Sequence, residues 1–198
     1  MEKRVLKPGA MLAPAPAVMV SCGDMEKSNI ITIAWTGIVN SNPPMTYISV
    51  RPERHSYEII KNSGEFVINL TTKNLVFAAD YCGVKSGRDI DKFEQMKLTK
   101  EKASKVSAPM IAESPINLEC RVKDIIHLGS HDMFLAEIVA VNVSESIIDA
   151  SGGIRFEKCA LAAYAHGQYF ALGAQLGRFG YSVRKKTRGK SRKQPNKK

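Results

Sequence analysis

The feature that most constrains the fold is a pair of long β-type segments, residues 116–128 and 133–144, separated by only four residues. Both segments are rich in β-branched residues, and the turn Gly129-Ser130-His131-Asp132 is short enough to join them as an antiparallel hairpin. Long hairpins of this kind twist strongly and usually close into a barrel. The sequence therefore predicts a β-rich fold built around this hairpin.

The rest of the chain also favours strands over helices. Further strands are predicted over 17–22, 30–39, 45–51, 65–70 and 161–164, each bounded by Gly, Pro, Asn or Asp. Only two helices are predicted, over 56–63 before Gly64 and over 74–81 before Gly83. The charged segment 97–105 is predicted to be a surface excursion. A chain of 198 residues is expected to form one domain, here a mainly β one.

The net charge of +10 lies almost entirely at the carboxyl end. Residues 183–198 carry nine Lys or Arg and no Asp or Glu, which leaves 20 basic and 19 acidic residues in 1–182. A segment with so few apolar residues cannot offset its ordering entropy, so we expect a folded domain over 1–182 and a disordered basic tail over 183–198. The tail is either simply solvated or makes weak, salt-sensitive contacts with nucleic acid or anionic lipid.

The four cysteines, Cys22, Cys82, Cys120 and Cys159, are spread evenly and have no spacing typical of a metal site. We therefore expect no metal. Each lies in or beside an apolar stretch, as buried free thiols do in a reducing compartment, which favours the cytoplasm. No signal peptide and no membrane-spanning segment is predicted.

The strand over 29–37 has one unusually open face. With a period of two, Ile31, Ile33 and Trp35 share one side, and the small or hydroxylated Thr32, Ala34 and Thr36 share the other. The second side leaves room for a flat ring close to the backbone. The alternative is a polar strand face in contact with water.

A predicted anion site follows where a strand ends and a helix begins. Arg51, Arg54, His55 and Ser56 combine two guanidinium groups, a hydroxyl and the free N–H groups of a helix start. This set suits a phosphate monoester. The alternative is a Ser56 that caps the helix beside solvated arginines.

The third candidate is the glycine-spaced basic segment 82–93. Its two glycines permit close backbone approach, while Ser86, Arg88 and Lys92 could reach the same phosphate. Its spacing fits neither a P-loop nor a dinucleotide-binding fingerprint. On its own it could equally be a surface loop.

Taken together and in order, these segments resemble the flavin-reductase-like domain family, the FMN-binding split barrels that include flavoredoxins. The resemblance runs from about residue 14 to 172. It is carried by Asn-Ile-Ile-Thr-Ile-Ala-Trp-Thr-Gly at 29–37, Asn-Pro-Pro at 42–44, Arg-His-Ser-Tyr at 54–57, and the segments 64–70, 86–93 and 129–131.

The resemblance implies a six-stranded Greek-key barrel that binds one FMN per subunit near a homodimer interface. Thr32, Ala34, Trp35 and Thr36 would line the flavin ring, mostly through the main chain. Arg54, His55 and Ser56, with Arg51 beside them, would hold the phosphate, and Asn69, Ser86, Gly87 and Lys92 would complete the phosphate and ribityl contacts.

His131 matches the Gly-x-His position of the family, which in two-component reductases lies beside the reduced nicotinamide. Two features depart from the family pattern. Ala136 stands where many relatives have Gly, and the basic tail has no counterpart.

The resemblance implies an oxidoreductase that takes electrons from NAD(P)H or a small redox protein and passes them through FMN to flavin or a protein acceptor. A non-catalytic FMN-binding protein that stores or senses flavin is the alternative. A third possibility is an RNA-associated protein, whose binding would then reside in the basic tail.

Overall fold

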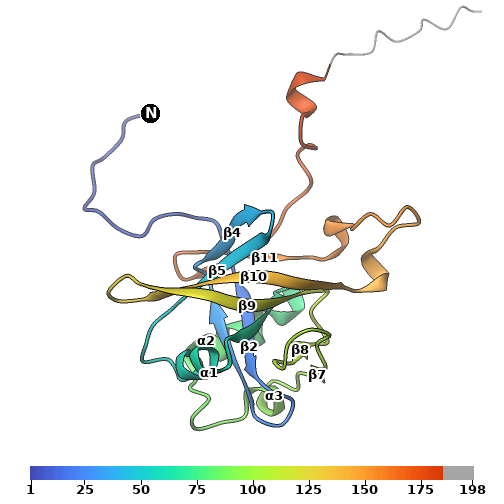
Figure 1. Ribbon diagram of the computed structural model, residues 1–198. Coiled ribbons are helices and arrows are strands. Elements are labelled where there is room, and N and C mark those ends of the chain that lie inside the picture. Colours follow the sequence, from blue (N-terminus) through green and yellow to red (C-terminus); the bar gives the residue numbers. More distant parts are fainter. Residues whose placement is uncertain (185–198) are drawn as a thin grey trace, which may run out of the picture.

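The computed structural model describes residues 1–184 (Figure 1). The predicted basic tail, 183–198, lies outside the described residues except for its first two positions. Seven antiparallel strands form the main sheet in the order β3–β2–β6–β9–β10–β5–β4. Their bounds are β2 (Val18–Gly23), β3 (Ser28–Ile33), β4 (Thr36–Ser41), β5 (Pro44–Val50), β6 (Glu65–Leu70), β9 (Ile116–His127) and β10 (Asp132–Val143).

Two smaller sheets and several short helices complete the described chain. A three-stranded sheet joins β1 (Ala15–Pro16), β11 (Ala162–Ala165) and β12 (Gln168–Ala171), and β7 (Lys100–Glu101) pairs with β8 (Met110–Ile111). The helices are α1 (His55–Ser63), α2 (Val76–Val84) and α3 (Lys92–Gln95), with 3₁₀ turns η1 (Lys73–Leu75), η2 (Glu145–Ile147), η3 (Phe156–Lys158) and η4 (Tyr181–Val183). None of the helices within residues 1–184 is long and apolar enough to cross a membrane.

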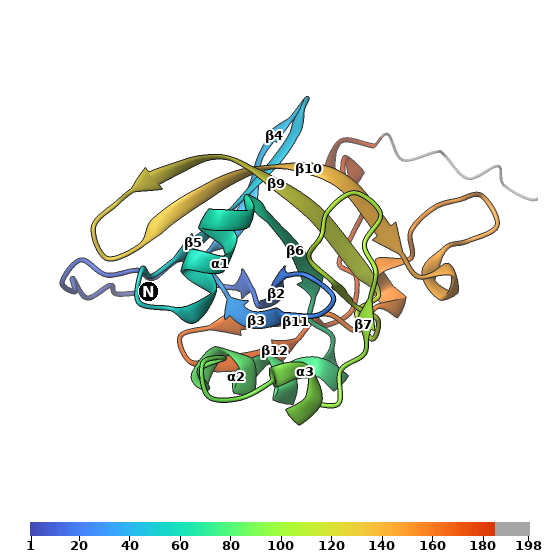
Figure 2. The ribbon, with the colours of Figure 1, turned by 60° about the horizontal axis from the view of Figure 1, so that its bottom comes forward.

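The predicted hairpin is confirmed as β9 and β10, which pair from Asp132 opposite His127 to Val143 opposite Ile116. Two register shifts interrupt the ladder. In Figure 2 the hairpin curves over the other elements, as expected of long strands that twist. The fold is thus mainly β, and its sheet curls into a barrel that does not close, as in a split barrel.

The predicted strand over 30–39 is wrong as a single element. It is two strands, β3 and β4, which lie at opposite edges of the main sheet and are joined only by Ala34 and Trp35. The sheet curls until these edges approach each other, with β3 beside β5 and the Ser49 N–H donating to the Trp35 carbonyl at 3.0 Å. We call this link, Ala34–Trp35, the seam.

Apolar side chains on the inner face of the sheet form the main core. Phe66 and Phe134 are fully buried there, and α1 closes one end of the core with Tyr57 and Ile60. The Tyr57 ring meets the Phe134 ring edge-on, at 5.2 Å between centroids. Helix α1 is therefore fixed by packing, and so is the chain that leads into it.

A second apolar layer attaches α2 and α3 to the outer face of β2 and β3. Met19 and Ile30 of the sheet pack against Ala79 and Cys82 of α2 and against Phe93 of α3. Figure 2 shows both helices on this side of β3. The chain between α2 and α3 is consequently held close to β3.

The structure differs from the sequence-based expectations at one helix boundary, one additional helix and one surface segment. Helix α2 does not stop before Gly83 but continues to Val84. Gly83 lies against the Thr32 side chain, which would be 3.3 Å from an added Cβ. The short helix α3 was not predicted at all. The predicted surface excursion 97–105 is wrong in part, since Leu98 and Ala103 are buried.

The buried carboxylate of Glu119 explains why the segment after 103 is fixed. One of its oxygens, Oε1, accepts from the Ser104 N–H and hydroxyl and from the Asn142 amide, and Oε2 accepts from the Lys105 and Val106 N–H groups. Glu119 is fully buried. The carboxylate thus accepts hydrogen bonds from the backbone N–H groups of 104–106, a loop whose N–H groups are not paired with a strand.

Candidate functional site

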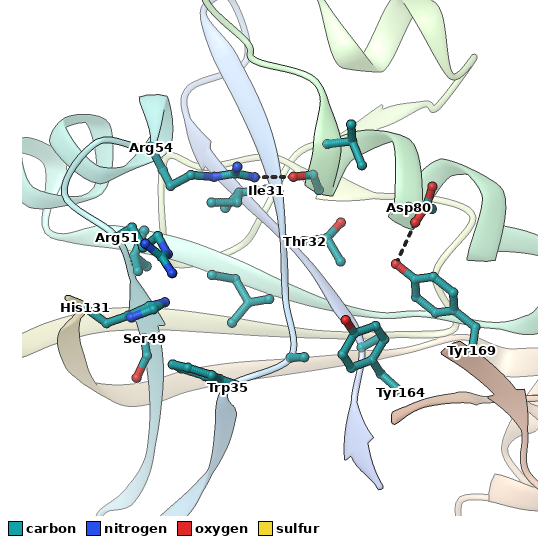
Figure 3. A pocket seen from close by; sticks show the side chains of 16 residues that line it. Ile31, Thr32, Trp35, Ser49, Arg51, Arg54, Asp80, His131, Tyr164 and Tyr169 are labelled. Carbon is teal, nitrogen blue, oxygen red and sulfur yellow. Dashed lines mark hydrogen bonds between the residues drawn. The ribbon is translucent and has the colours of Figure 1, made fainter. Parts of the chain in front are cut away.

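The seam opens a hollow between the two edges of the curled sheet. This seam hollow has a volume of about 420 Å³, and the exposed Trp35 lies at its edge (Figure 3). Its lining residues are Ala17, Ile31, Thr32, Ile33, Ala34, Trp35, Ser49, Val50, Arg51, Arg54, Asp80, Gly83, Val84, His131, Tyr164 and Tyr169. A volume of this order suits a small organic ligand.

His131 and Trp35 form one wall of the seam hollow. Their ring centroids are 4.5 Å apart with an interplanar angle of 40°, and the Ser130 hydroxyl lies 3.0 Å from Nδ1 of His131. Burial and the nearby Arg51 guanidinium lower the pKa of His131 below its usual value. His131 is therefore a neutral imidazole near pH 7, suited to packing and hydrogen bonding.

The opposite wall comprises Tyr164 of β11, Tyr169 of β12 and Asp80 of α2. None of these three residues is predicted from the sequence as part of a site. Only the hairpin could have been found, since Tyr164 and Tyr169 flank a His166-Gly167 turn between two short alternating stretches. Their approach to Asp80 has no local signal.

A second, smaller hollow adjoins the first. This loop hollow has a volume of about 190 Å³. Ile31, Arg54 and Val84 line both hollows, which therefore adjoin each other. Its lining residues are Asn29, Ile31, Glu53, Arg54, His55, Ser56, Val84, Lys85, Ser86, Gly87, Arg88 and Lys92.

The amino end of α1 faces the loop hollow. Arg54 precedes the helix in an extended conformation, and no side chain caps it. The first N–H groups of α1, at His55 and Ser56, therefore remain available to an anion, with the positive end of the helix dipole behind them. Burial and the Arg88 charge lower the pKa of His55, so its imidazole is neutral near pH 7.

Two cations stand beside this helix end, and both are held by backbone carbonyls. The Arg54 guanidinium donates to the Gly83 carbonyl. The Lys92 ammonium donates to the carbonyls of Ile30 at 2.7 Å and Cys82 at 2.8 Å. Burial, helped by the Arg54 charge, lowers the pKa of Lys92 to about 8. Lys92 therefore keeps its charge at neutral pH although its side chain is almost completely buried.

Close backbone packing shapes the floor of the loop hollow. The Asn29 amide donates to the Ser56 hydroxyl at 2.8 Å, and a Cβ on Gly87 would lie 2.1 Å from Oδ1 of the same Asn29. Any larger residue at position 87 would force the Asn29 side chain to move. The Ser86 hydroxyl lies at the beginning of this turn and accepts from the Arg88 N–H at 3.2 Å.

The structure brings most of the predicted site residues into these two hollows. Thr32, Ala34, Trp35, Arg51 and His131 line the seam hollow, His55, Ser56, Ser86, Gly87 and Lys92 line the loop hollow, and Arg54 lines both. The side chain of Thr32 is directed outward, where its hydroxyl donates to the Ala79 carbonyl of α2.

Thr36 and Asn69 differ from the other predicted site residues, because neither lines one of the two hollows. Because β3 ends at Ile33 and β4 begins at Thr36, the alternation of side chains along β3 does not continue to Thr36. The Thr36 hydroxyl donates to the Tyr47 carbonyl of the neighbouring strand β5. Asn69 lies on the face of β6 that packs against the segment 103–111. Its amide donates to the Met19 carbonyl, and its Oδ1 accepts from the Ile111 N–H and the Asn117 amide, so it joins layers of the fold.

The two adjoining hollows suit a ligand with a flat part and an anionic end. The wide seam hollow is lined by strand backbone and aromatic rings, whereas the loop hollow offers a helix end, two cations and hydroxyl groups. Within residues 1–184, no group of three or more His, Cys, Asp or Glu side chains is arranged to hold a metal ion.

Comparison with known proteins places the chain among flavin-related folds. The family model described as "Flavin reductase like domain" matches residues 11–173. An uncharacterized protein of Archaeoglobus fulgidus is 29% identical over 157 residues, which are 79% of this chain and 88% of that protein.

Two solved structures are similar over nearly the whole chain. The flavoredoxin of Desulfovibrio vulgaris (Miyazaki F) is 30% identical with a TM-score of 0.86, covering 92% of this chain and 100% of that one. The flavoredoxin from Methanosarcina acetivorans is 27% identical with a TM-score of 0.82, covering 93% and 100%.

Proposed function

Because this chain belongs to the flavin reductase like domain family, which has the fold of flavin-related oxidoreductases, we propose that it binds FMN and transfers electrons through it. The observation that carries the proposal is that the two hollows adjoin and share the lining residues Ile31, Arg54 and Val84. A flavin ring needs a wide, flat-sided hollow, and a phosphate on a short chain needs a basic hollow next to it.

The residues of the loop hollow fit a phosphate monoester. Arg54 and Lys92 supply charge, Ser56 and Ser86 supply hydroxyl groups, and the start of α1 supplies N–H donors. The tight turn at Gly87 keeps this space free of a side chain. In the seam hollow, the main chain around the seam would hold the ring.

The flavin, when bound, supplies the electron-accepting and electron-donating chemistry, and the protein positions and tunes it. Arg51 and Arg54 place positive charge beside the seam hollow, which favours negative charge on a ligand there. His131, as a neutral imidazole packed on the exposed Trp35, would position the electron donor, NAD(P)H or a small redox protein, at the mouth of the hollow.

We expect the purified or reconstituted protein to be yellow and to contain about one FMN per chain, in preference to FAD. The small loop hollow, closed by the turn at Gly87, suits a terminal phosphate better than a diphosphate carrying a nucleoside. Heat extraction and chromatography of the bound flavin measure this. Extracted FAD without FMN, or no binding of either at micromolar concentration, would refute the proposal.

Oxygen-free mixing with NADH or NADPH tests the electron transfer itself. An oxidoreductase that uses nicotinamide loses its flavin absorbance in a stopped-flow trace. An FMN-loaded protein that bleaches with neither nucleotide nor a reduced redox protein would instead be the non-catalytic storage or sensor protein.

We also propose that the chain forms a homodimer. The apolar side chains of Ile38 and Val39 on edge strand β4 are 68% and 50% exposed, close to the exposed Trp35 of the seam. A second copy on this face would help to form the flavin pocket, so stability should rise with both protein and flavin concentration. Light scattering is expected to give twice the 21.8 kDa chain mass, and a flavin-loaded monomer would contradict the proposal.

The four cysteines support a cytoplasmic location. All four are buried and free, and burial raises the pKa of Cys22 and Cys82 to about 11, which keeps them as thiols. Unpaired buried thiols are typical of a reducing compartment. Fractionation of cells that recovered the protein outside the cytoplasm would exclude this location.

A further inference from the structure

The tip of the β9–β10 hairpin, residues 123–131, extends beyond the other strands of the sheet (Figure 1). Its side chains are exposed or only partly buried, so packing contributes little to its position. His131 lies at the end of this tip and nevertheless forms a wall of the seam hollow, with its ring centroid 4.5 Å from that of Trp35. A contact other than packing must therefore hold the hairpin tip beside the hollow.

The residue that follows His131 supplies such a contact. Asp132 is only 4% exposed, which is unusual for a carboxylate, and its Oδ2 accepts a hydrogen bond from the Tyr57 hydroxyl at 2.5 Å. Nδ1 of His127, on the other strand of the hairpin, lies 2.8 Å from the same oxygen. Asp132 thus joins both strands of the hairpin to helix α1.

The hydrogen bond between Asp132 and Tyr57 keeps one group ionised and the other protonated. Above all, the bond from the Tyr57 hydroxyl lowers the pKa of Asp132 below its usual value. The same bond, together with burial, raises the pKa of Tyr57 to about 12. Near pH 7 the carboxylate therefore accepts and the hydroxyl donates, and a hydrogen bond to an ionised acceptor is stronger than one between neutral groups.

Tyr57 is itself firmly held. Its ring is buried against Phe134, and its N–H donates to the Arg54 carbonyl at 2.9 Å in the first turn of α1. On the other side of the bond, Asp132 pairs with Val50 of β5, which lines the seam hollow. The bond therefore fixes the end of the hairpin tip relative to the start of α1, which faces the loop hollow.

We propose that Asp132 and Tyr57 are positioning residues for His131, and that their hydrogen bond holds the imidazole against Trp35, where it would receive the electron donor. This assignment rests on the proposed function and extends it from the group that would contact the donor to the pair behind that group. Asp132 and Tyr57 line neither of the two hollows, so both act through the hairpin tip.

Trp35 makes the position of His131 measurable. It is the only tryptophan of the chain, so all tryptophan fluorescence comes from this site. A protonated imidazole in contact with an indole ring quenches its emission, so the emission of the apoprotein should fall when His131 takes up a proton. A contact needed only for stability would lower the melting temperature without changing this quenching.

In the wild-type apoprotein we expect the fall below pH 6.5, the usual pKa of histidine. Burial, followed by the Arg51 charge, lowers the pKa of His131, whereas Glu53 raises it by a smaller amount. His131→Gln should abolish the fall, which would assign it to this residue and not to His55 or His127.

Three variants test the pair. Tyr57→Phe removes the hydroxyl and keeps the ring against Phe134, Asp132→Ala removes the carboxylate, and Asp132→Asn keeps an oxygen that can accept from Tyr57. Matched controls are Tyr81→Phe, a tyrosine that lines neither hollow, and Asp124→Asn, an exposed carboxylate of the hairpin tip. Melting temperatures of the apoproteins accompany each titration.

We expect Tyr57→Phe and Asp132→Ala to reduce the depth of the quenching by about two-fold or more and to move its midpoint towards pH 6.5. The reason is that a displaced imidazole lies farther from Trp35 and is better hydrated. Asp132→Asn should retain most of the quenching, and the controls should retain all of it. Unchanged quenching in both Tyr57→Phe and Asp132→Ala would overturn the assignment.

Reduction of the FMN-loaded protein by NADH or NADPH without oxygen gives a second readout. Tyr57→Phe should lower the bimolecular rate constant by about three-fold to ten-fold and change the FMN affinity by less than about two-fold. Added to His131→Gln, it should lower the rate constant no further, because both substitutions act through one imidazole. A further loss in the double variant would show that Tyr57 acts independently of His131, against the assignment.

Failure of the proposed function would be distinguishable from failure of this assignment. If the wild-type protein binds no flavin, the proposed function fails, but the fluorescence titration of the apoprotein still decides whether Asp132 and Tyr57 position His131. If Asp132→Ala does not fold, Tyr57→Phe decides, because it retains the buried ring.

Discussion

Replacing Arg54 or Lys92 with alanine is expected to weaken FMN binding by about ten-fold to a hundred-fold and to leave riboflavin binding nearly unchanged. Both cations line the loop hollow beside the start of α1. A charge-assisted hydrogen bond to a phosphate contributes roughly 1.5–3 kcal/mol to binding. Riboflavin has no phosphate, so its affinity does not depend on this bond. Parallel titrations with the two flavins measure the difference.

Two control variants separate charge from packing in this test. Lys92 is almost fully buried, so Lys92→Ala can also destabilise the fold. In that case Lys92→Met is the better variant, because it keeps the apolar stem of the side chain and removes only the charge. Arg178→Ala removes an exposed arginine outside both hollows and should change neither affinity. Equal losses for both flavins at an unchanged melting temperature would mean that the phosphate lies elsewhere.

The pH dependence of binding provides a second readout for Lys92. Its pKa in the free protein is lowered to about 8, chiefly by burial, so above pH 8 the free protein increasingly carries a neutral amine. A bound phosphate favours the charged form, and binding must then take up a proton. The FMN affinity should therefore fall as pH rises above 8, and this fall should be absent in Lys92→Met and for riboflavin.

The substitution Glu119→Gln is expected to lower the free energy of unfolding by about 3–5 kcal/mol, although it lies outside both hollows. The fully buried carboxylate accepts hydrogen bonds from Ser104, Lys105, Val106 and Asn142. A glutamine amide would direct N–H groups at some of these donors and leave them unsatisfied. For a chain of this length the melting temperature should fall by roughly 6–20 °C, measured by calorimetry.

The effect of Glu119 should also depend on pH, with a definite sign. Burial alone would raise the pKa of this carboxyl, but the hydrogen bonds from Ser104 and Asn142 outweigh it and bring the pKa below its usual value of 4.5. A lowered pKa stabilises the fold fully above about 4.5, and the contribution is lost as pH falls through the pKa of the folded state. The difference between wild type and Glu119→Gln should thus shrink in acid. Glu101→Gln, an exposed carboxylate nearby, should have little effect at any pH.

The sequence predicted those parts of the fold that depend on local chemistry. The long hairpin follows from two β-rich runs around a four-residue turn, and the end of α1 follows from Gly64, which adopts a positive φ of 67°. The phosphate-type cluster at Arg54, His55 and Ser56 was also predictable, because a helix start and its cations are adjacent in sequence.

The parts that the sequence could not predict depend on distant partners. Strands β3 and β4 separate because β3 pairs with β2 while β4 pairs with β5. The residues around Ala34 do not indicate that the two strands have different partners. The sequence of β6 does not indicate whether Asn69 faces the hollows or the opposite side of the sheet. That depends on where the distant segment 103–111 packs. Asp80 and Tyr169 are 89 residues apart, so neither reveals the other.

The carboxyl end of α2 has a consequence for how fast a ligand binds and leaves. Its Cys82 and Gly83 carbonyls hold Lys92 and Arg54 in position before any ligand arrives. A helix end of negative polarity also offsets the repulsion between these two cations. Because these long side chains are already ordered, binding of an anion involves little further loss of their conformational entropy. Such preorganisation lengthens the residence time of a bound ligand more than it speeds its arrival.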